Sequence, residues 1–242
     1  MNRHAITLAL LACVTFLVSL GCEAPGKPVL AEAARPDDVL DFPTLYAQNC
    51  AACHGRDGKG GATLPLANPV YLAVAGSDNI QRITADGVAG TAMPPFARSR
   101  GGMLSDRQIA ALTKGIIDTW GHADTGELIR YAGTAPGDPE RGQADYATFC
   151  ARCHGANGTG MKGDNGVWTG SIVDPAYLDL VSDQYLRSTI IAGLPDRKMP
   201  DWRSLLIGSN ARAMTEQEIA DTVAWITSHR VAAPGQPYPQ HP

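Results

Sequence analysis

The chain has 242 residues, of which 44% are hydrophobic, and it carries a formal net charge of −4. This length allows one or two domains with a packed core. The net negative charge gives no basic patch of the kind that binds a phosphate backbone, so nucleic acid is not expected as a partner.

Residues 1–21 predict an export signal peptide. Arg3 precedes a mostly apolar run from Ala5 to Leu20, which at 16 residues is shorter than the roughly 20 that span a bilayer. The stretch ends in SLGC, with Cys22 placed as in a bacterial lipobox. We therefore expect a lipid on Cys22 that attaches the exported chain to a membrane on the periplasmic side. A plain cleaved signal and a retained anchor are the alternatives.

Stretches rich in proline, glycine and charge divide the rest of the chain. They predict a flexible tether over residues 22–40, a linker over 131–139 and a disordered tail over 232–242. Two domains are expected between them, over residues 41–130 and 140–231.

The two domains are copies of one another. Tyr46 and Tyr146 stand four residues before matching Cys-x-x-Cys-His runs, and NPVYL in the first copy corresponds to DPAYL in the second. Gly87 and Gly193 each precede a Met-Pro pair by six residues. The offset between matches drifts from 100 to 110, so the second copy carries insertions.

Each copy predicts three helices, and no run alternates well enough to predict a sheet, so the expected fold class is all-α. The first helix leads into the Cys-x-x-Cys-His run. The second is expected to begin at an N-cap serine, Ser77 or Ser182, and to end near Gly87 or Gly193.

The third helix opens with a capping box in both copies, Ser105 with Gln108 and Thr215 with Glu218. Apolar residues follow at helical spacing. Tyr46 and Tyr146 are expected to pack the first helix of their copy against the third.

The runs at 50–54 (CAACH) and 150–154 (CARCH) match the attachment signature of c-type heme. On a helical turn the two sulfurs lie on one side, where both can bond the vinyl-derived carbons of a porphyrin, and the histidine points at the iron. Two covalently bound heme c groups are therefore predicted. The attachment residues would be Cys50, Cys53, Cys150 and Cys153, and the iron ligands His54 and His154.

Other uses of these cysteines fit less well. A thioredoxin-like dithiol would need strands around it. A zinc site would need a fourth ligand, and neither copy offers another cysteine or a nearby histidine. A disulfide within Cys-x-x-Cys would close almost no loop.

A methionine is expected as the second axial ligand of each iron. Met93 and Met199 lie 39 and 45 residues after the histidines, each directly before a proline in the loop between the second and third helices. A thioether is a soft ligand that favours reduced iron. Core packing is the ordinary role of methionine, and Met103, Met161 and Met214 are the rival ligands.

The stretches YAQNCAACHGRDGKGG (46–61) and YATFCARCHGANGTG (146–160), together with the Met-Pro pairs, resemble tandem diheme cytochromes c of class I. The resemblance covers about residues 41–229. It implies a helical fold with one heme per domain and His/Met coordination. A proline carbonyl often accepts the histidine Nδ1 hydrogen bond in that family, which points to Pro65 in the first copy. The second copy has GDNGVW (163–168) there instead.

Iron centres with both axial positions filled predict an electron carrier rather than an enzyme. The expected partner is a redox protein or a membrane electron-transfer complex, since domains that resemble these serve terminal oxidases and periplasmic dehydrogenases. The alternative is a diheme peroxidase or small-molecule oxidoreductase, which needs an open position at one heme. His122 and His229, the histidines available for such chemistry, fall near the ends of the third helices.

Overall fold

The computed structural model describes residues 35–122, 129–163, 166–203 and 212–232. Contacts divide the chain into residues 1–36 and residues 37–242, and the elements described below lie in the second unit apart from the first residue of η1. The expected signal peptide, Cys22 and most of the expected tail lie outside the described residues. None of the helices in the described ranges is long and apolar enough to cross a membrane.

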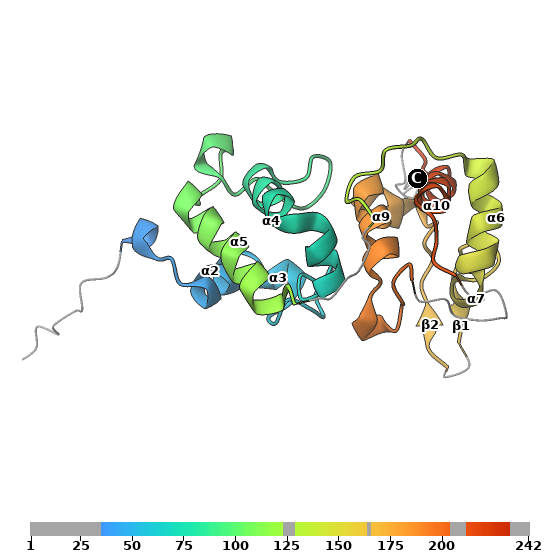
Figure 1. Cartoon of the computed structure of the whole chain (residues 1–242), viewed down its shortest axis with the longest axis horizontal. Helices are drawn as coiled ribbons and strands as arrows, with labels where there is room; N and C mark the ends of the chain where they lie inside the picture. Colours follow the sequence, from blue (N-terminus) through green and yellow to red (C-terminus); the bar gives the residue numbers. More distant parts are fainter. Residues whose placement is uncertain (1–34, 123–128, 164–165, 204–211, 233–242) are drawn as a thin grey trace, which may run out of the picture. The chain divides into compact units, whose positions relative to one another are not determined.

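The fold class is all-α, as predicted, and the described elements form two helical lobes. The first lobe consists of η1 (Pro36–Asp38), α2 (Phe42–Asn49), α3 (Ala51–His54), α4 (Pro69–Asp86), η2 (Arg98–Arg100) and α5 (Asp106–Trp120) (Figure 1). The second consists of α6 (Pro139–Phe149), α7 (Ala151–His154), β1 (Met161–Lys162), β2 (Trp168–Thr169), α8 (Pro175–Leu180), α9 (Asp183–Ala192), η3 (Pro195–Arg197) and α10 (Glu216–Thr227). Helix α6 begins inside the expected linker, because Asp138 caps it and Pro139 occupies its first position.

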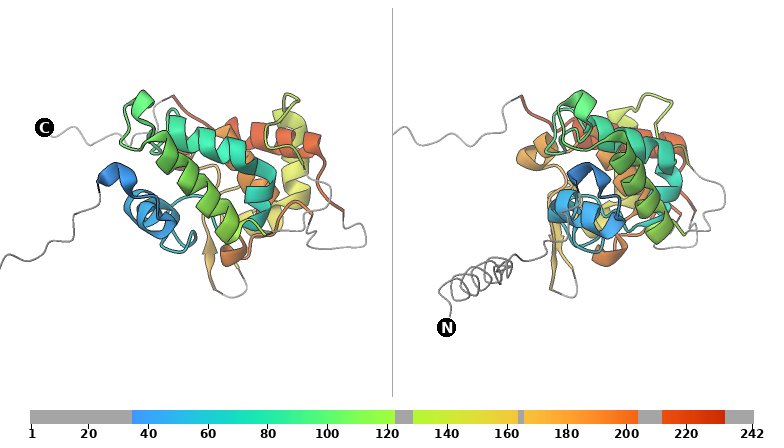
Figure 2. Two further views of the ribbon diagram at one scale, coloured as in Figure 1. Left: turned by 60° about the vertical axis from the view of Figure 1, so that its left-hand side comes forward. Right: turned by 90° about the vertical axis from the view of Figure 1, so that its left-hand side faces the viewer.

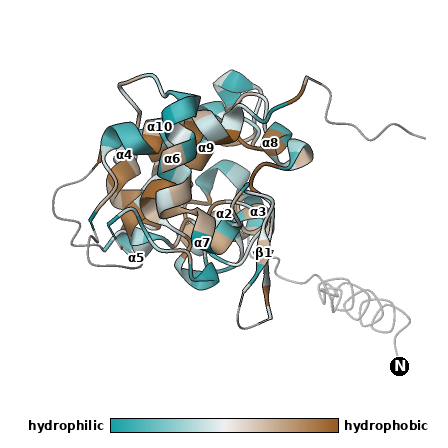
Figure 3. Cartoon of the chain, turned by 90° about the vertical axis from the view of Figure 1, so that its right-hand side faces the viewer, coloured by the Kyte–Doolittle hydropathy of each residue, from teal (hydrophilic) through white to brown (hydrophobic). Residues whose placement is uncertain are grey.

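The last helix of each lobe carries the apolar stripe on which the lobe is built. Both predicted capping boxes form, at Ser105 in α5 and at Thr215 in α10. In α5 the stripe of Ile109, Leu112 and Ile116 is at most 2% exposed and packs against α2 and α4. Figure 2 shows α4 and α5 side by side in the first lobe, and Figure 3 shows apolar and polar residues on different faces of the helices. In the second lobe, α6 and α9 pack against α10 in the same way.

The second helix starts at the predicted residue in both lobes, but the predicted serine cap forms in only one of them. In the second lobe the Ser182 hydroxyl caps α9 by accepting from the Tyr185 backbone N–H, as expected. In the first lobe α4 begins earlier, at Pro69 with Asn68 as its N-cap, and the non-helical φ of 70° at Gly76 divides it into two helical segments, the second of which starts at Ser77. The Ser77 hydroxyl donates to the Asp78 carboxylate at 3.4 Å and is not an N-cap. The extra turn over 69–75 corresponds to the separate helix α8.

The second lobe also contains a small hairpin that the sequence did not predict. Strands β1 and β2 pair antiparallel, with Met161 opposite Thr169 and Lys162 opposite Trp168. The hairpin projects from the second lobe and falls where the sequence offset between the copies grows (Figure 1). Trp168 on it is 69% exposed. Two-residue strands are too short to show an alternating pattern.

The first and last helices of each lobe cross at a contact between one aromatic side chain and one glycine, and the helix that carries the glycine differs between the two lobes. In the first lobe Phe42 on α2 packs over Gly115 on α5, where a Cβ would lie 2.2 Å from the phenyl ring. In the second lobe Gly142 on α6 receives Trp225 on α10. Residues 42 and 142 are equivalent in the repeat, as are 115 and 225, so large and small side chains have exchanged helices. Either arrangement fills the crossing, which is what close packing requires.

Replacing Gly142 by alanine is expected to destabilise the second lobe. The added Cβ would lie 1.9 Å from the Asp221 carbonyl oxygen, so two helix backbones must separate. Overpacking of this kind costs about 1–3 kcal/mol. Denaturant unfolding of the second lobe should show this loss, while Gln143→Ala on the exposed face of α6 should not. A smaller loss is expected for Gly115→Ala, because there the obstacle is the half-buried side chain of Phe42. Equal losses at the two glycines would contradict this.

Candidate heme sites

The Cys-x-x-Cys-His runs form single helical turns with the same geometry in both lobes. Cys50 and Cys150 start α3 and α7 with φ of −119° in each case. The turns end at Gly55 and Gly155, whose φ values of 85° and 79° lie in the region that favours glycine. A Cβ on Gly55 would lie 1.9 Å from the Lys59 carbonyl oxygen. The chain therefore leaves the turn directly after the histidine, which places two sulfurs and one imidazole on one short element.

A buried tyrosine connects each turn to the helices around it. The Tyr46 hydroxyl donates to the Gly55 carbonyl at 2.9 Å, and the Tyr146 hydroxyl donates to the Gly155 carbonyl. The Tyr46 ring contacts Trp120 at 5.1 Å between centroids, and Tyr146 stacks on Trp225 at 4.1 Å. The predicted packing role of both tyrosines is thus confirmed, and their hydroxyls also hold the end of the attachment turn.

None of the four cysteines of the two turns forms a disulfide. Cys53 and Cys153 are exposed, whereas burial raises the pKa of Cys50 to about 11 and that of Cys150 to about 12. The nucleophilic cysteine of a redox-active dithiol has a lowered pKa, and Cys50 and Cys150 have the opposite shift. Within the described ranges no group of three or more His, Cys, Asp or Glu side chains could hold a bare metal ion.

The imidazole of His54 is held by one backbone contact. Its Nδ1 lies 2.8 Å from the carbonyl oxygen of Leu64. A carbonyl only accepts, so Nδ1 must carry the proton, and the Nε2 lone pair is left for iron. Burial lowers the pKa of His54, opposed by the Leu64 carbonyl, so the ring is neutral as a ligand must be. The expectation that Pro65 supplies this carbonyl is wrong by one residue, since Pro65 instead fixes the backbone that follows Leu64.

His154 has a looser contact at the equivalent position. Its Nδ1 is buried and makes no hydrogen bond of ideal geometry with the described residues. Burial lowers the pKa of His154, and a backbone hydrogen bond with Gly170 opposes that effect, as the Leu64 carbonyl does for His54.

Each Met-Pro pair lies on a loop, and equivalent contacts fix the loop in the two lobes. Gly87 and Gly193 end the preceding helices with φ of 68° and 65°. A Cβ on Gly87 would lie 2.8 Å from the Met93 carbonyl oxygen, and one on Gly193 would lie 2.6 Å from that of Met199. The Met93 carbonyl accepts from Val88 N–H at 3.0 Å, and that of Met199 from the residue after Gly193 at 2.9 Å. Both methionines are half-buried.

The rival methionines have other surroundings. Met103 is 78% exposed, and Met161 lies on the hairpin at 37% exposure. Met214 is buried in the core of the second lobe, and its backbone N–H donates to the Trp202 carbonyl at 3.0 Å. Core packing therefore accounts for Met214.

His122 and His229 cap helix ends through backbone carbonyls. His122 Nε2 lies 2.7 Å from the Asp118 carbonyl oxygen, and His229 Nδ1 lies 2.9 Å from that of Trp225. These are the contacts expected of histidines in the last turn of a helix. One nitrogen of each of these imidazole rings is therefore occupied by a hydrogen bond to a helix end.

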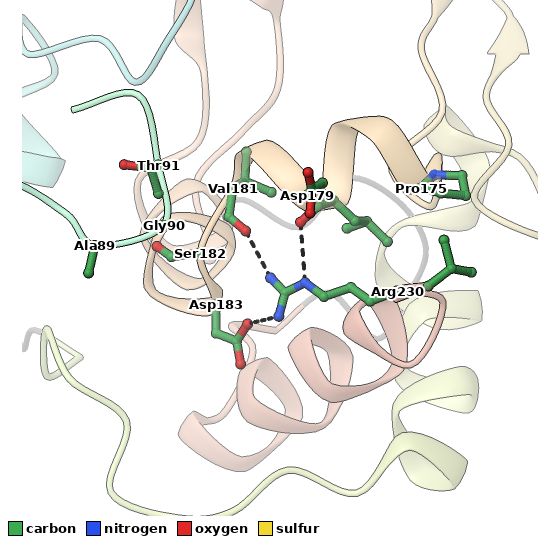
Figure 4. Close-up of a pocket in the computed structure, with 11 residues that line it drawn as sticks. Ala89, Gly90, Thr91, Pro175, Asp179, Val181, Ser182, Asp183 and Arg230 are labelled. Carbon is green, nitrogen blue, oxygen red and sulfur yellow. Dashed lines mark hydrogen bonds and ion pairs between the residues drawn. The ribbon is translucent and has the colours of Figure 1, made fainter. Parts of the chain in front are cut away.

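A cavity of about 290 Å³ lies beside α8 and contains none of the predicted heme ligands. Figure 4 shows Arg230 across it, with its guanidinium donating to the carbonyls of Leu178 and Val181 at 3.2 and 2.8 Å and pairing with Asp183. The charge of Arg230 is thus used to tie the end of α10 to the segment between α8 and α9.

Comparison with known proteins agrees with two heme lobes. Residues 37–114 match the family described as cytochrome c oxidase, cbb3-type, subunit III, and residues 139–230 match the family described as cytochrome c. Cytochrome c55X of Paracoccus denitrificans is 35% identical over 96 residues, which cover 39% of this chain and 77% of that protein. Both lobes therefore have the fold and the attachment turn that define c-type cytochromes.

Longer relatives are cytochrome c oxidase subunits. The cbb3-type subunit CcoP of Azospirillum sp. (strain B510) is 27% identical over 202 residues, covering 76% of this chain and 64% of that subunit. CcoP of Rubrivivax gelatinosus is 28% identical over 156 residues, covering 63% of this chain and 45% of that subunit. The chain thus spans about half to two thirds of the length of these subunits.

A solved structure from the Kuenenia stuttgartiensis reducing HAO-like protein complex aligns with a TM-score of 0.41 and 16% identity, covering 78% of this chain and 96% of that chain.

The chain belongs to the cytochrome c family and carries two cytochrome c domains in tandem. It is a diheme electron carrier, with one heme c attached through Cys50 and Cys53 and one through Cys150 and Cys153. The side chains fit that group, because each single helical turn brings together two cysteine sulfurs that form no disulfide and one imidazole. The feature that sequence reasoning missed is the difference between the two histidine contacts, which depends on Leu64 and Gly170.

Replacing Tyr146 by phenylalanine is expected to weaken the second lobe by about 0.5–1.5 kcal/mol at neutral pH, the net worth of one hydrogen bond. Burial raises the pKa of Tyr146 to about 12, against about 10 in an unfolded chain. The folded state therefore favours the protonated phenol, so this contribution is complete below pH 10 and is lost as pH rises from about 10 to about 12. Denaturant unfolding between pH 7 and 12 should show a smaller alkaline loss in the variant. Tyr46→Phe should change the first lobe instead, and an unchanged alkaline slope in Tyr146→Phe would be contrary to this account.

Proposed function

We propose that this chain is a membrane-tethered relay that passes electrons, on the extracytoplasmic face, between a redox partner and a membrane electron-transfer complex. The observation that carries the proposal is the repetition of the whole site. Each lobe combines an attachment turn closed by a glycine and a tyrosine with a methionine loop positioned by a second glycine. Two such sites in one chain suit transfer of electrons from one to the other.

The axial ligands we infer are His54 with Met93 and His154 with Met199. When bound, each heme supplies one-electron iron chemistry. In each lobe the attachment turn carries the histidine. The methionine lies on a loop whose position is fixed by a backbone hydrogen bond to the methionine carbonyl. A soft sulfur ligand favours the reduced iron. With both axial positions occupied, no site remains for substrate or oxygen chemistry, which argues against a diheme peroxidase.

Removing either methionine should open one heme. Reduced wild-type protein is expected to bind no carbon monoxide, because both sixth positions are filled. Met93→Ala and Met199→Ala should each bind it at one of the two hemes and show high-spin features in optical spectra. Met103→Ala, which changes a largely exposed side chain, is the matched control and should behave as wild type. Binding of carbon monoxide by the native wild-type protein would instead favour the peroxidase alternative.

We infer the tether from SLGC at residues 19–22 and the partner from the relatives. The relatives CcoP of Azospirillum sp. and of Rubrivivax gelatinosus are subunits of cbb3-type cytochrome c oxidases. A lipid on Cys22 would keep two heme lobes at the membrane surface. We therefore propose that the partner is a terminal oxidase of this type or a complex with the same need for a c-type electron carrier.

Changing Cys22 to alanine should release the protein from membranes. Wild-type protein is expected in the membrane fraction, with mass spectrometry finding lipid on Cys22 as the mature N-terminus, because the chain's described helices supply no membrane span. Cys22→Ala should move holoprotein to the soluble fraction, whereas Cys13→Ala, within the predicted signal, should not. After mild detergent extraction the wild type should elute with a larger redox complex. An unmodified Cys22 in mature protein would exclude the lipid tether.

A further inference from the structure

One buried asparagine links the two lobes by hydrogen bonds. Residues 37–242 form a single compact unit, so contacts between the lobes belong to its structure. Asn68, the N-cap of α4 in the first lobe, is only 2% exposed. Its amide nitrogen donates to the carbonyls of Ala192 and Gly193 at the end of α9, at 3.1 Å in each case. One side chain thus satisfies backbone groups at the start of a helix in one lobe and at the end of a helix in the other.

Apolar side chains from both lobes surround this contact. Ala192, at 2% exposure, belongs to the core cluster of the first lobe although it lies on α9. Val70 and Val74, on the first segment of α4, pack against the core of the second lobe. The two helix ends also carry opposite partial charges, since the start of α4 meets the end of α9. The carbonyls would be left unpaired and buried without the amide, so the loss of this contact is costly.

Capping alone does not explain why residue 68 is an asparagine. The equivalent N-cap in the second lobe is Asp174, which is exposed and accepts from the Tyr177 backbone N–H at 3.0 Å. Aspartate and asparagine cap helices about equally well. A carboxylate has no hydrogen to donate, whereas an amide both accepts and donates. Of the two residues, only the asparagine can cap α4 and also bind the carbonyls of α9.

The Gly193 carbonyl that Asn68 binds belongs to the peptide group on which the Met199 loop rests. The N–H at the other end of this peptide is that of Leu194, and it donates to the Met199 carbonyl at 2.9 Å. Met199 N–H returns a hydrogen bond to the Leu194 carbonyl at 3.1 Å. A peptide group is planar, so a bond that fixes its oxygen also fixes the direction of its N–H. The first lobe therefore holds the group that positions the methionine of the second.

The methionine loops of the two lobes differ in their local support. In the first lobe Met93 N–H donates to the Thr91 hydroxyl at 3.2 Å, and that hydroxyl donates to the Val88 carbonyl at 2.9 Å. In the second lobe Lys198, directly before Met199, has a φ of 59°, which a residue with a side chain rarely adopts. Such a conformation persists only when the surrounding structure fixes the backbone. The second loop therefore has the greater need of an outside contact.

We propose that Asn68 is a positioning residue for Met199, so that docking of the first lobe secures the sixth ligand of the second heme. The inference rests on the proposed ligation of iron by Met199. Asn68 acts through the peptide group between Gly193 and Leu194. When its two hydrogen bonds are lost, the loop releases the methionine more often, and the second iron opens to added ligands.

Cyanide binding to the oxidised holoprotein measures this release, because an added ligand can bind only after the methionine has left the iron. In Met93→Ala the first heme is open and reacts at once, so the slow kinetic phase reports the second heme. Asn68→Asp in that background keeps the N-cap acceptor and removes both donors. The slow phase should become about tenfold faster, the effect of leaving a buried carbonyl without its donor.

The reverse background and a matched control assign the effect. In Met199→Ala the slow phase reports the first heme, and Asn68→Asp should leave it unchanged. Asn79→Asp makes the same chemical change on the same helix, but the Asn79 amide donates to the Ala75 carbonyl within α4 at 2.8 Å. This control should leave the slow phase unchanged in both backgrounds.

Asn68→Ser keeps the test clear if a buried carboxylate prevents folding. Serine still caps α4, adds no charge and offers no amide to the two α9 carbonyls, so it should also speed the second-heme phase. An unchanged second-heme phase in folded, fully heme-loaded Asn68 variants would overturn the proposal. Equal acceleration at the first heme would overturn it too, since the effect would then arise within the first lobe.

Wild-type spectra separate failure of this inference from failure of the proposed function. Heme content by mass spectrometry and axial ligation by magnetic circular dichroism are measured on the same samples. Two His/Met hemes in the wild type, with cyanide entry that does not depend on Asn68, would defeat the inference and leave the electron relay intact. A second heme without a methionine ligand in the wild type would defeat the proposed ligation itself.

Discussion

The single helical turn that carries two cysteines and a histidine is the constraint on which each lobe depends. Covalent attachment fixes the porphyrin to that turn, so the rest of the lobe must form around it. The positive φ of the glycine after the histidine lets the chain leave at once, and the tyrosine hydroxyl closes the turn from within the core. Because the tyrosine ring also contacts the tryptophan of the last helix, the position of the turn and the packing of the terminal helices are coupled.

The two lobes share most of the residues that shape the attachment turn, apart from Leu64 and its counterpart Gly170, and they differ more freely in residues that only fill space. The attachment turn, its glycine, its tyrosine and the glycine before the methionine loop are all repeated. At the crossing of the terminal helices, by contrast, Phe42 over Gly115 is replaced by Gly142 under Trp225. A core tolerates such exchanges when the total volume is preserved. The geometry of the site, which depends on backbone angles and single atoms, allows less variation.

Sequence reasoning succeeded where the signal is local. The attachment runs, the capping boxes at Ser105 and Thr215 and the fold class all depend on residues within a few positions of one another. It failed where a distant or competing contact decides. Asn68 caps a helical segment that precedes the predicted start at Ser77, the hairpin strands are too short for periodicity, and the carbonyl over His54 belongs to Leu64 rather than Pro65. The contact of His154 with Gly170 also depends on how the chain folds back after the hairpin, which no local pattern predicts.

A duplicated heme domain gives a carrier two one-electron centres in one polypeptide. Both copies keep the attachment turn, its glycine and its tyrosine, so the element that holds the porphyrin is preserved twice. The second copy departs from the first at the backbone beside the histidine, where Gly170 takes the position of Leu64. A change at that position alters the surroundings of the imidazole and leaves the cysteines and the histidine in place, so one centre can diverge from the other without losing the residues that attach its heme.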